Sequence, residues 1–398
     1  MIAIARLILL ASVILIGTGA DIYAARNDVP GMGLHVGVAL LAIASICYIA
    51  IYNRFFELHF ARTPSWLFTL LLGWGVICTP LADDIGLALL TLSRYIVIFI
   101  TAVILISIAG KGRKFESVLN TGVHFSIYIL TSTIAIDAIQ PGTFSKILTR
   151  PAGLAENPNG AAQLLAMLLT MILLLEHDKP PNRKLMMTSA AAITGIFMTL
   201  SRGGFVMAVT LILAILLLKV SKFRNISVPL IAACLGVGAF LMLPTVDSIA
   251  IFQNQTTMTR MERLVDLSYY TDTSDSRFEL AQSYFAYASP WFGSGPGATA
   301  LVDAFGGATH NTFLKMYWES GIIGAILYTL IIFIPLFIAR SGVIILSVSI
   351  MTFLSLVTNY NMDNRSFHLL VIITYMIAGL IRVERRNRYI MRDDLDPS

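Results

Sequence analysis

Residues 86–109 read GLALLTLSRYIVIFITAVILISIA, a run with a single charged residue, Arg94. About 20 apolar residues in an α-helix cross a hydrocarbon core that is about 30 Å thick. Only helices and closed barrels satisfy every backbone polar group inside a bilayer. The run therefore predicts a membrane-spanning helix and places the protein in the class of integral membrane proteins.

The rest of the chain repeats this pattern. Of its 398 residues, 57% are hydrophobic and 13% are charged, and the mean hydropathy is +0.78, whereas soluble proteins carry about 25% charged residues. We expect an all-α membrane protein without a sizeable soluble domain, and we expect its first apolar run to be retained rather than cleaved as a signal peptide. The roughly twelve candidate spans are residues 3–20, 34–52, 65–82, 86–109, 117–138, 160–176, 185–200, 204–220, 227–243, 320–338, 342–358 and 367–382.

Lysine and arginine in the short loops indicate the orientation of the spans. Cytoplasmic loops of membrane proteins are the basic ones. Here basic residues collect in one alternate set of loops and in the C-terminal tail, which predicts that both termini are cytoplasmic. The net charge of +5 thus reflects topology and does not indicate a nucleic-acid partner. The opposite short loops, predicted to be outer, carry only Arg26, Lys146, Arg150, Arg202 and Arg365.

This orientation divides the chain into three predicted parts. Residues 1–243 hold the first nine spans, and residues 320–398 hold the last three spans and a basic cytoplasmic tail. Residues 244–319 form one large outer loop with short helices, the only long polar segment of the chain. Charged groups are costly to keep where a polar loop enters a membrane helix. We therefore expect the working site at this outer loop.

Arg202 lies in TLSRGG, residues 199–204, between two apolar runs. An arginine at the end of a span often only extends its charge to the membrane surface. However, outer loops disfavour arginine, and the two glycines let a backbone or a ligand approach closely. A guanidinium binds a phosphate with two parallel hydrogen bonds. Arg202 is therefore a candidate phosphate ligand.

A helix start is predicted inside the outer loop. Ser276 and Glu279 have the spacing of a capping box, which places Arg277 at the first helical position. Free N–H groups and the helix dipole attract anions there, so Arg277 is a second candidate anion ligand, although a solvated loop arginine fits equally well. Arg260 and Arg263 either support this site or pair with neighbouring acids.

His310 and Asn311 stand where the outer loop enters an apolar helix. A lone histidine is more often a packing residue. A helix that starts here would place His310 on one face with Tyr317 and Gly321, and a glycine lets a neighbouring span pack closely. Neutral imidazole can take a proton from a hydroxyl near neutral pH. His310 is therefore a candidate general base.

Two further outer loops are rich in polar side chains. Arg150, Asn157 and Asn159 lie just before the span at 160–176. The asparagines suit the capping of that helix, which is the more common role, and they also suit hydrogen bonds to a sugar. Residues 359–366 suit either a solvated turn or a carbohydrate contact in the same way.

We expect neither a metal nor a cofactor. The six histidines do not show the spacing of metal ligands, and Cys47, Cys78 and Cys234 show no paired spacing. The sequence also contains no phosphate-binding loop and no nucleophile elbow. An enzyme that faces outward has no ATP, so its substrate must arrive already activated.

Three motifs in order resemble the bacterial O-antigen ligase and polymerase superfamily. The first is the segment with Ser201-Arg202, and the second runs from Arg277 to PWFGSG at residues 290–295. The third is His310-Asn311, followed after nine residues by Gly321-Ile-Ile-Gly324. Asn157-Pro-Asn159 before a span is also similar to the family, and the motifs together cover residues 155–330.

The resemblance implies a GT-C-like multi-span glycosyltransferase of the bacterial inner membrane whose site faces the periplasm. Such an enzyme moves a glycan from undecaprenyl pyrophosphate to lipid A–core oligosaccharide without a metal. By position, Arg202 and Arg277 would hold the pyrophosphate, and His310 would orient or deprotonate the acceptor hydroxyl, with inversion at the sugar carbon. Further candidate ligands of pyrophosphate or glycan are Asn311, Arg260, Arg263, Asn157, Asn159 and Arg150.

Other functions remain open at this point. Within the superfamily, an O-antigen polymerase or a protein O-oligosaccharyltransferase differs only in its acceptor. A polysaccharide or lipid transporter belongs to another class, but it should carry ionisable residues within its spans, and here only Arg94 lies well inside a run. A purely structural role would leave the ordered arginines and the histidine unexplained.

Overall fold

The computed structural model describes residues 2–27, 62–109, 113–148, 150–219, 289–300, 311–358 and 361–393. Every regular element in these ranges is a helix, which confirms the all-α class there. The predicted spans 34–52 and 227–243 lie outside the described residues, and the total of twelve stays a prediction. Within the described ranges, six helices are long and apolar enough to cross a membrane: Thr63–Leu81, Ile85–Ile104, Ser117–Ile139, Pro158–Leu175, Thr312–Ile338 and Arg365–Asn387.

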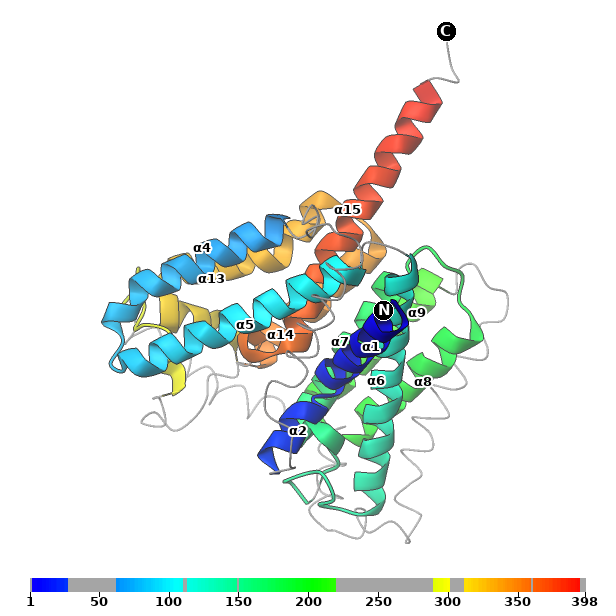
Figure 1. The fold of residues 1–398 in the computed structure, drawn as a ribbon, viewed down its shortest axis with the longest axis horizontal. Coiled ribbons are helices and arrows are strands. Elements are labelled where there is room, and N and C mark those ends of the chain that lie inside the picture. Colours follow the sequence, from blue (N-terminus) through cyan, green and yellow to red (C-terminus); the bar gives the residue numbers. More distant parts are fainter. Residues whose placement is uncertain are drawn as a thin grey trace, which may run out of the picture. The chain divides into compact units, whose positions relative to one another are not determined.

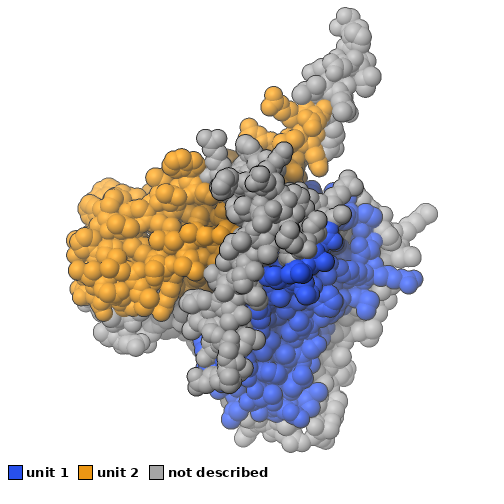
Figure 2. Space-filling view, in the orientation of Figure 1, with its two compact units in different colours: residues 1–55, 108–275 blue, residues 56–107, 276–398 orange. Residues whose placement is uncertain are grey.

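The chain forms two compact units, each assembled from separate stretches of sequence. Unit 1 comprises residues 1–55 and 108–275, and unit 2 comprises residues 56–107 and 276–398 (Figure 2). Large apolar side chains stay exposed on the long helices, as in Trp66, Leu70 and Leu89. Such exposure suits a lipid environment, because a water-soluble surface rarely tolerates large apolar patches. The protein is therefore a multi-pass membrane protein.

Unit 1 is a bundle around one enclosed helix, α7 (Figure 1). Helix α7 packs against α6, α8 and α9, and α1 packs along α6. A Cβ atom at Gly122 of α6 would lie 2.5 Å from Val13 of α1, so the glycine lets these two helices approach closely. The elements of unit 1 are α1 (Ile2–Thr18), α2 (Ala20–Arg26), α6 (Arg113–Ile139), η2 (Gly153–Ala155), α7 (Pro158–Leu175), α8 (Arg183–Met198) and α9 (Arg202–Lys219).

Glu176, which ends α7, lies in a buried polar cluster with α6. Its Oε1 accepts a hydrogen bond from Asn120 Nδ2 at 2.7 Å and lies 3.5 Å from His124 Nε2. The His124 ring lowers the pKa of Glu176 to about 2 against the opposite effect of burial, with help from Asn120. A pKa below the unfolded value means that this carboxylate stabilises the fold above about pH 4.5 and that the stabilisation is lost as the pH falls towards 2.

We expect Glu176→Gln to lower the unfolding temperature of the purified protein by several degrees at pH 7, because the variant loses the charged contact with α6. The difference from the unmodified protein should shrink as the pH falls below about 4.5. Thermal unfolding in detergent at several pH values measures both effects. Asp178→Asn, which alters an exposed acid two residues further on, is the control, and an equal loss in that variant would contradict the prediction.

Unit 2 is organised around α13, which packs against α4, α14 and α15; α4 and α13 lie side by side in Figure 1. Tyr328 of α13 and Phe367 of α15 are fully buried and stack with ring centroids 6.4 Å apart. The elements of unit 2 are α4 (Arg62–Cys78), η1 (Thr79–Leu81), α5 (Ile85–Ala109), η5 (Ala298–Ala300), α13 (Thr312–Ile338), α14 (Gly342–Val357), η7 (Asn361–Asp363) and α15 (Arg365–Asp393).

Candidate functional site

The turn between α8 and α9 places Arg202 at the start of a helix. Leu200, within the turn, has a φ of 53°, a left-handed conformation that is uncommon for a residue with a side chain. The Ser201 hydroxyl accepts a hydrogen bond from Gly204 N at 3.2 Å and so caps α9. Arg202, half-buried, is the first residue of α9. Its guanidinium therefore belongs to a helix end where free N–H groups and the helix dipole already favour an anion.

Gly204 allows α9 to pack closely on α7. A Cβ atom at this position would lie 2.8 Å from the Cβ of Ala162. The sequence predicted that a glycine beside Arg202 permits a close approach, and the structure confirms it with a neighbouring helix as the partner. Any substitution that adds a side chain at Gly204 should therefore displace the start of α9.

Arg150 reaches the same turn from the 139–159 loop. Its buried guanidinium donates from Nε to Thr199 O at 3.1 Å and from Nη2 to Asn159 Oδ1 at 2.9 Å. The first of these bonds holds the residue three positions before Arg202, and the second holds the first turn of α7. Three of the predicted site residues, Arg150, Asn159 and Arg202, thus belong to adjoining segments of unit 1.

Asn157 caps α7, as the common role of such a residue predicts. Its Oδ1 accepts hydrogen bonds from Asn159 N at 2.9 Å and from Gly160 N at 3.5 Å. The side-chain oxygen is therefore engaged with the backbone, and Asn157 is exposed. A sugar contact by Asn157 stays a prediction.

Glu156 fastens the end of the 139–159 loop to α2. Its carboxylate accepts hydrogen bonds from Arg26 at 2.9 Å and from Asn27 at 3.2 Å, and it lies 3.4 Å from Lys146 Nζ. Burial alone would raise the pKa of Glu156, but the bonds from Arg26 and Asn27 and the nearby positive charges lower it below its usual value. The carboxylate is therefore ionised at neutral pH and can hold both cations.

In unit 2, Asn311 marks the start of α13. Its side chain accepts a hydrogen bond from Leu314 N at 3.1 Å, and the first helical residue is Thr312. The sequence predicted a helix that begins beside His310-Asn311, and this start is confirmed. His310 itself lies outside the described residues.

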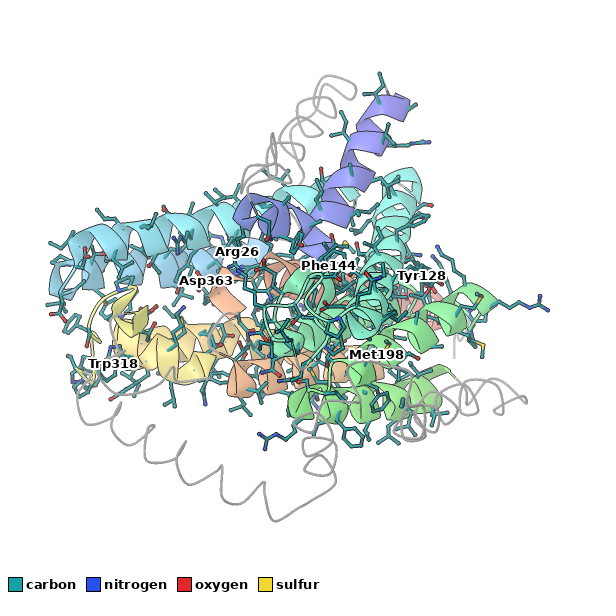
Figure 3. The ribbon with its side chains drawn as sticks, turned by 90° about the horizontal axis from the view of Figure 1, so that it is seen from below. Arg26, Tyr128, Phe144, Met198, Trp318 and Asp363 are labelled. Atoms are coloured by element: carbon teal, nitrogen blue, oxygen red, sulfur yellow. The ribbon has the colours of Figure 1, made fainter. Side chains whose placement is uncertain are left out.

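The PWFGSG turn holds a break in α13. Gly321 has a φ of 65°, which interrupts the helix, and a Cβ there would collide with the carbonyl of Trp291. Ile322 N donates to Pro290 O at 2.9 Å, and Ser294 N donates to Trp318 O at 2.7 Å. Figure 3 shows Trp318 on α13 next to the 289–300 segment. The sequence predicted that Gly321 lets a neighbouring span pack closely. In the structure, the backbone that approaches Gly321 is instead that of the PWFGSG turn, at Trp291 and Phe292.

We expect Gly293→Ala to destabilise unit 2. Gly293 has a φ of 70°, and an added Cβ would lie 2.5 Å from Trp318 O. The left-handed backbone alone costs a residue with a side chain about 1–2 kcal/mol, and the collision adds to it. Thermal unfolding measures the loss. Gly73→Ala, which adds a Cβ into open space on α4, should be neutral or stabilising, and equal unfolding temperatures for the two variants would refute the interlocking of turn and helix.

A buried polar cluster beside this break was not predicted from the sequence. Glu319, 1% exposed, accepts hydrogen bonds from the hydroxyls of Thr299 at 2.7 Å and Tyr95 at 3.2 Å. Lys315, one turn earlier on α13, pairs with Asp363 at 3.0 Å and lies over the Tyr95 ring. The cluster ties α5, η5 and η7 to the first turns of α13. Its only sequence signal was an acid and a base four residues apart in an apolar helix.

In the asparagine-rich loop that was predicted to be outer, the described residues 361–366 have structural roles. Asn361 is buried and donates to Ser355 Oγ at 2.9 Å, and Asn364 accepts from Ser366 N at 2.9 Å. These contacts differ from those of a solvated turn. Among the described residues of this loop, Asp363 remains partly exposed, with 31% of its side-chain surface accessible.

The predicted site residues are divided between the two units, and some of them lie outside the described ranges. Arg150, Asn157, Asn159 and Arg202 belong to unit 1, and Asn311 belongs to unit 2. Arg260, Arg263, Arg277 and His310 lie outside the described residues. In the part of the chain that the structure describes, no group of three or more His, Cys, Asp or Glu side chains is placed to hold a metal ion.

Comparison with known proteins supports the motif analysis. Residues 187–329 match a family model described as O-Antigen ligase. The match includes the α8–α9 turn with Arg202, the PWFGSG turn and the start of α13, and it confirms the resemblance seen in the motifs. No match to this chain was found among curated proteins.

Proposed function

We propose that this chain is an O-antigen ligase, and the match of residues 187–329 to the O-Antigen ligase family model supports the proposal. It transfers a glycan en bloc from undecaprenyl pyrophosphate to lipid A–core oligosaccharide at the periplasmic face of the bacterial inner membrane. The observation that carries the proposal is the setting of Arg202. This cation lies at the capped start of α9 and follows, in sequence, a turn that Arg150 holds by a buried hydrogen bond to Thr199.

The reaction needs a base and a stabilised leaving group. The acceptor hydroxyl attacks the anomeric carbon of the glycan while the bond from that carbon to the pyrophosphate oxygen breaks. His310 takes the hydroxyl proton, and the pyrophosphate leaves with the bonding electrons. Arg202 and Arg277 stabilise the charge that grows on it, as fixed cations do at a departing anion. Attack opposite the leaving group inverts the sugar carbon.

Reconstitution with defined substrates tests the function. Purified protein is incubated with a carrier-linked glycan and lipid A–core, without metal or nucleotide, and the products are separated by mass. Glycan on lipid A–core supports the ligase. Longer glycan on the carrier would instead identify a polymerase, and glycan on an added protein acceptor would identify a protein oligosaccharyltransferase. Movement of the lipid between leaflets without any covalent product would indicate a transporter.

We expect transfer to survive complete chelation of divalent metal ions, because arginines rather than a metal stabilise the pyrophosphate in this mechanism. Activity is measured after dialysis against EDTA and again after Mg²⁺ or Mn²⁺ is returned. Loss of transfer with EDTA and recovery with one of these ions would overturn the metal-independent mechanism.

We expect topology reporters fused after Lys184 and after Arg224 to read as cytoplasmic, and one fused near Asp272 to read as periplasmic, because of the charge bias of the loops. Contacts within the units support this assignment. Arg26 pairs with Glu156, both on the predicted outer side, and Arg385 donates to the carbonyl of Arg340, both on the predicted inner side. A cytoplasmic signal near Asp272 would place the site on the wrong face for its donor.

A further inference from the structure

Asp137 is a buried acid in the last turn of α6, and 1% of its surface is exposed. A helix C-terminus carries partial negative charge, so an acid there is disfavoured by the helix itself. A buried carboxylate is also costly unless hydrogen bonds satisfy it. The residue therefore needs a reason outside its own helix.

The reason lies in the 139–159 loop. Asp137 Oδ1 accepts hydrogen bonds from Phe144 N at 3.1 Å and Ser145 N at 3.2 Å. Its Oδ2 accepts from Ala152 N at 2.8 Å and Gly153 N at 3.3 Å. One carboxylate thus gathers two stretches of backbone that are seven or more residues apart. These four hydrogen bonds fix both stretches against the end of α6, so Asp137 holds the shape of this loop.

Arg150 sits in the part of the loop that this template encloses. Its backbone is three residues from Gly153, and its guanidinium is buried against Thr199 and Asn159. Arg150 therefore connects the 139–159 loop to the α8–α9 turn through its hydrogen bond to Thr199 O. The Glu156 pairs with Arg26 and Lys146 anchor the far end of the same loop, and Figure 3 shows Arg26 and Phe144 in this region.

The α8–α9 turn needs external support. Leu200 adopts a positive φ of 53° between Thr199, which Arg150 holds, and Ser201, which caps α9. Sparsely populated backbone conformations persist only where the surroundings over-determine them. The hydrogen bond from Arg150 to the carbonyl before Leu200 is such a constraint, and the residue after Ser201 is Arg202.

We propose that Asp137 is a positioning residue for Arg202, which it controls through the 139–159 loop, Arg150 and the carbonyl of Thr199. Asp137 does not touch the substrate in this scheme. The expected effect on turnover rests on the proposed function, whereas the expected effect on the structure does not. This relay connects residues 65 positions apart in sequence by contacts that all lie within unit 1.

The test uses Asp137→Asn in the full-length protein. Asparagine keeps one acceptor oxygen, but its amide group faces backbone donors, so two of the four hydrogen bonds are lost. Hydrogen–deuterium exchange should become about tenfold faster both in peptides of 143–153 and in those of 199–203, since lost hydrogen bonds favour local opening. Turnover should fall by up to about 100-fold, the cost of moving a catalytic group by about 1 Å.

Arg150→Met breaks only the second part of the relay, from Arg150 to Thr199, and leaves the hydrogen bonds of Asp137 in place. It also tests the proposal if Asp137→Asn fails to fold. It should speed exchange in 199–203 and leave the amides of residues 144, 145, 152 and 153 protected. The turnover of the double variant should be only slightly lower than that of the more damaging single variant, because both changes break one chain of contacts. Thr133→Val, which removes one 3.4 Å bond from Leu154 N to the same helix, is the matched control and should change neither 199–203 nor turnover.

Two results would overturn the relay. One is unchanged exchange in 199–203 in a folded Asp137→Asn or Arg150→Met variant. The other is a double variant whose loss of turnover equals the product of the two single losses. If the protein transfers no glycan at all, the proposed function fails, and the exchange measurement still decides the relay by itself.

Discussion

Replacing His310 by alanine should lower the turnover of glycan transfer roughly 100- to 10,000-fold, the usual contribution of a general base. His310 directly precedes Asn311, whose side chain caps α13 with a hydrogen bond from Leu314 N. The buried Lys315 and Glu319 hold the next turns of the helix to α5, η5 and η7. The proposed base thus directly precedes, in sequence, a helix start that these contacts hold in place. Binding of the donor should be nearly unchanged, because in the proposed mechanism the arginines hold the pyrophosphate.

His310→Asn tells a base from a residue that only orients the acceptor. Asparagine can hydrogen-bond a hydroxyl but cannot take its proton. It should therefore be as inactive as alanine if His310 is the base. Turnover and donor affinity are measured on variants matched for expression and unfolding temperature, since His310 borders the cap of α13. Near-normal turnover in His310→Asn would end the general-base mechanism and leave an orienting role.

Replacing Arg202 by alanine should lower turnover about 100- to 1,000-fold, as the loss of a fixed group that stabilises developing negative charge does. The fold should survive, because the Ser201 cap of α9 and the packing of Gly204 on Ala162 both remain in this variant. Arg202→Lys should recover little, since an ammonium cannot make the two parallel hydrogen bonds of a guanidinium. Arg277→Ala and Arg277→Lys should behave in the same way.

Arg183→Ala is the matched control for Arg202. Arg183 is likewise the first residue of a unit 1 helix, α8, but it lies in a loop predicted to be cytoplasmic. Its loss should leave turnover within the error of the assay. Steady-state transfer with saturating acceptor measures all of these variants. If Arg183→Ala and Arg202→Ala lost turnover equally, general destabilisation would explain both, and full activity in Arg277→Lys would leave a role for charge alone.

Local pattern in the sequence was enough for the class of the fold and for several helix ends. Long apolar runs predicted membrane helices, because a bilayer leaves few other ways to satisfy backbone polar groups. The spacing of Asn157 and Asn311 before apolar runs predicted two helix starts that the structure bears out. Short motifs also sufficed for the resemblance to the O-antigen ligase family, because residues 199–204, 290–295 and 310–324 keep their order along the chain and lie in the segment that matches the family model.

Contacts between distant residues could be read only from the tertiary structure. Nothing in the sequence around Asp137 indicates that it binds four backbone N–H groups, or that Arg150 bonds to Thr199, 49 positions away. The units are likewise built from separate stretches of sequence. Periodicity and capping report neighbours three or four residues apart, whereas a buried carboxylate or guanidinium finds its partners wherever folding brings unsatisfied polar groups together. The sequence by itself therefore determined the kind of protein and its motifs, and the tertiary structure decided what supports Arg202.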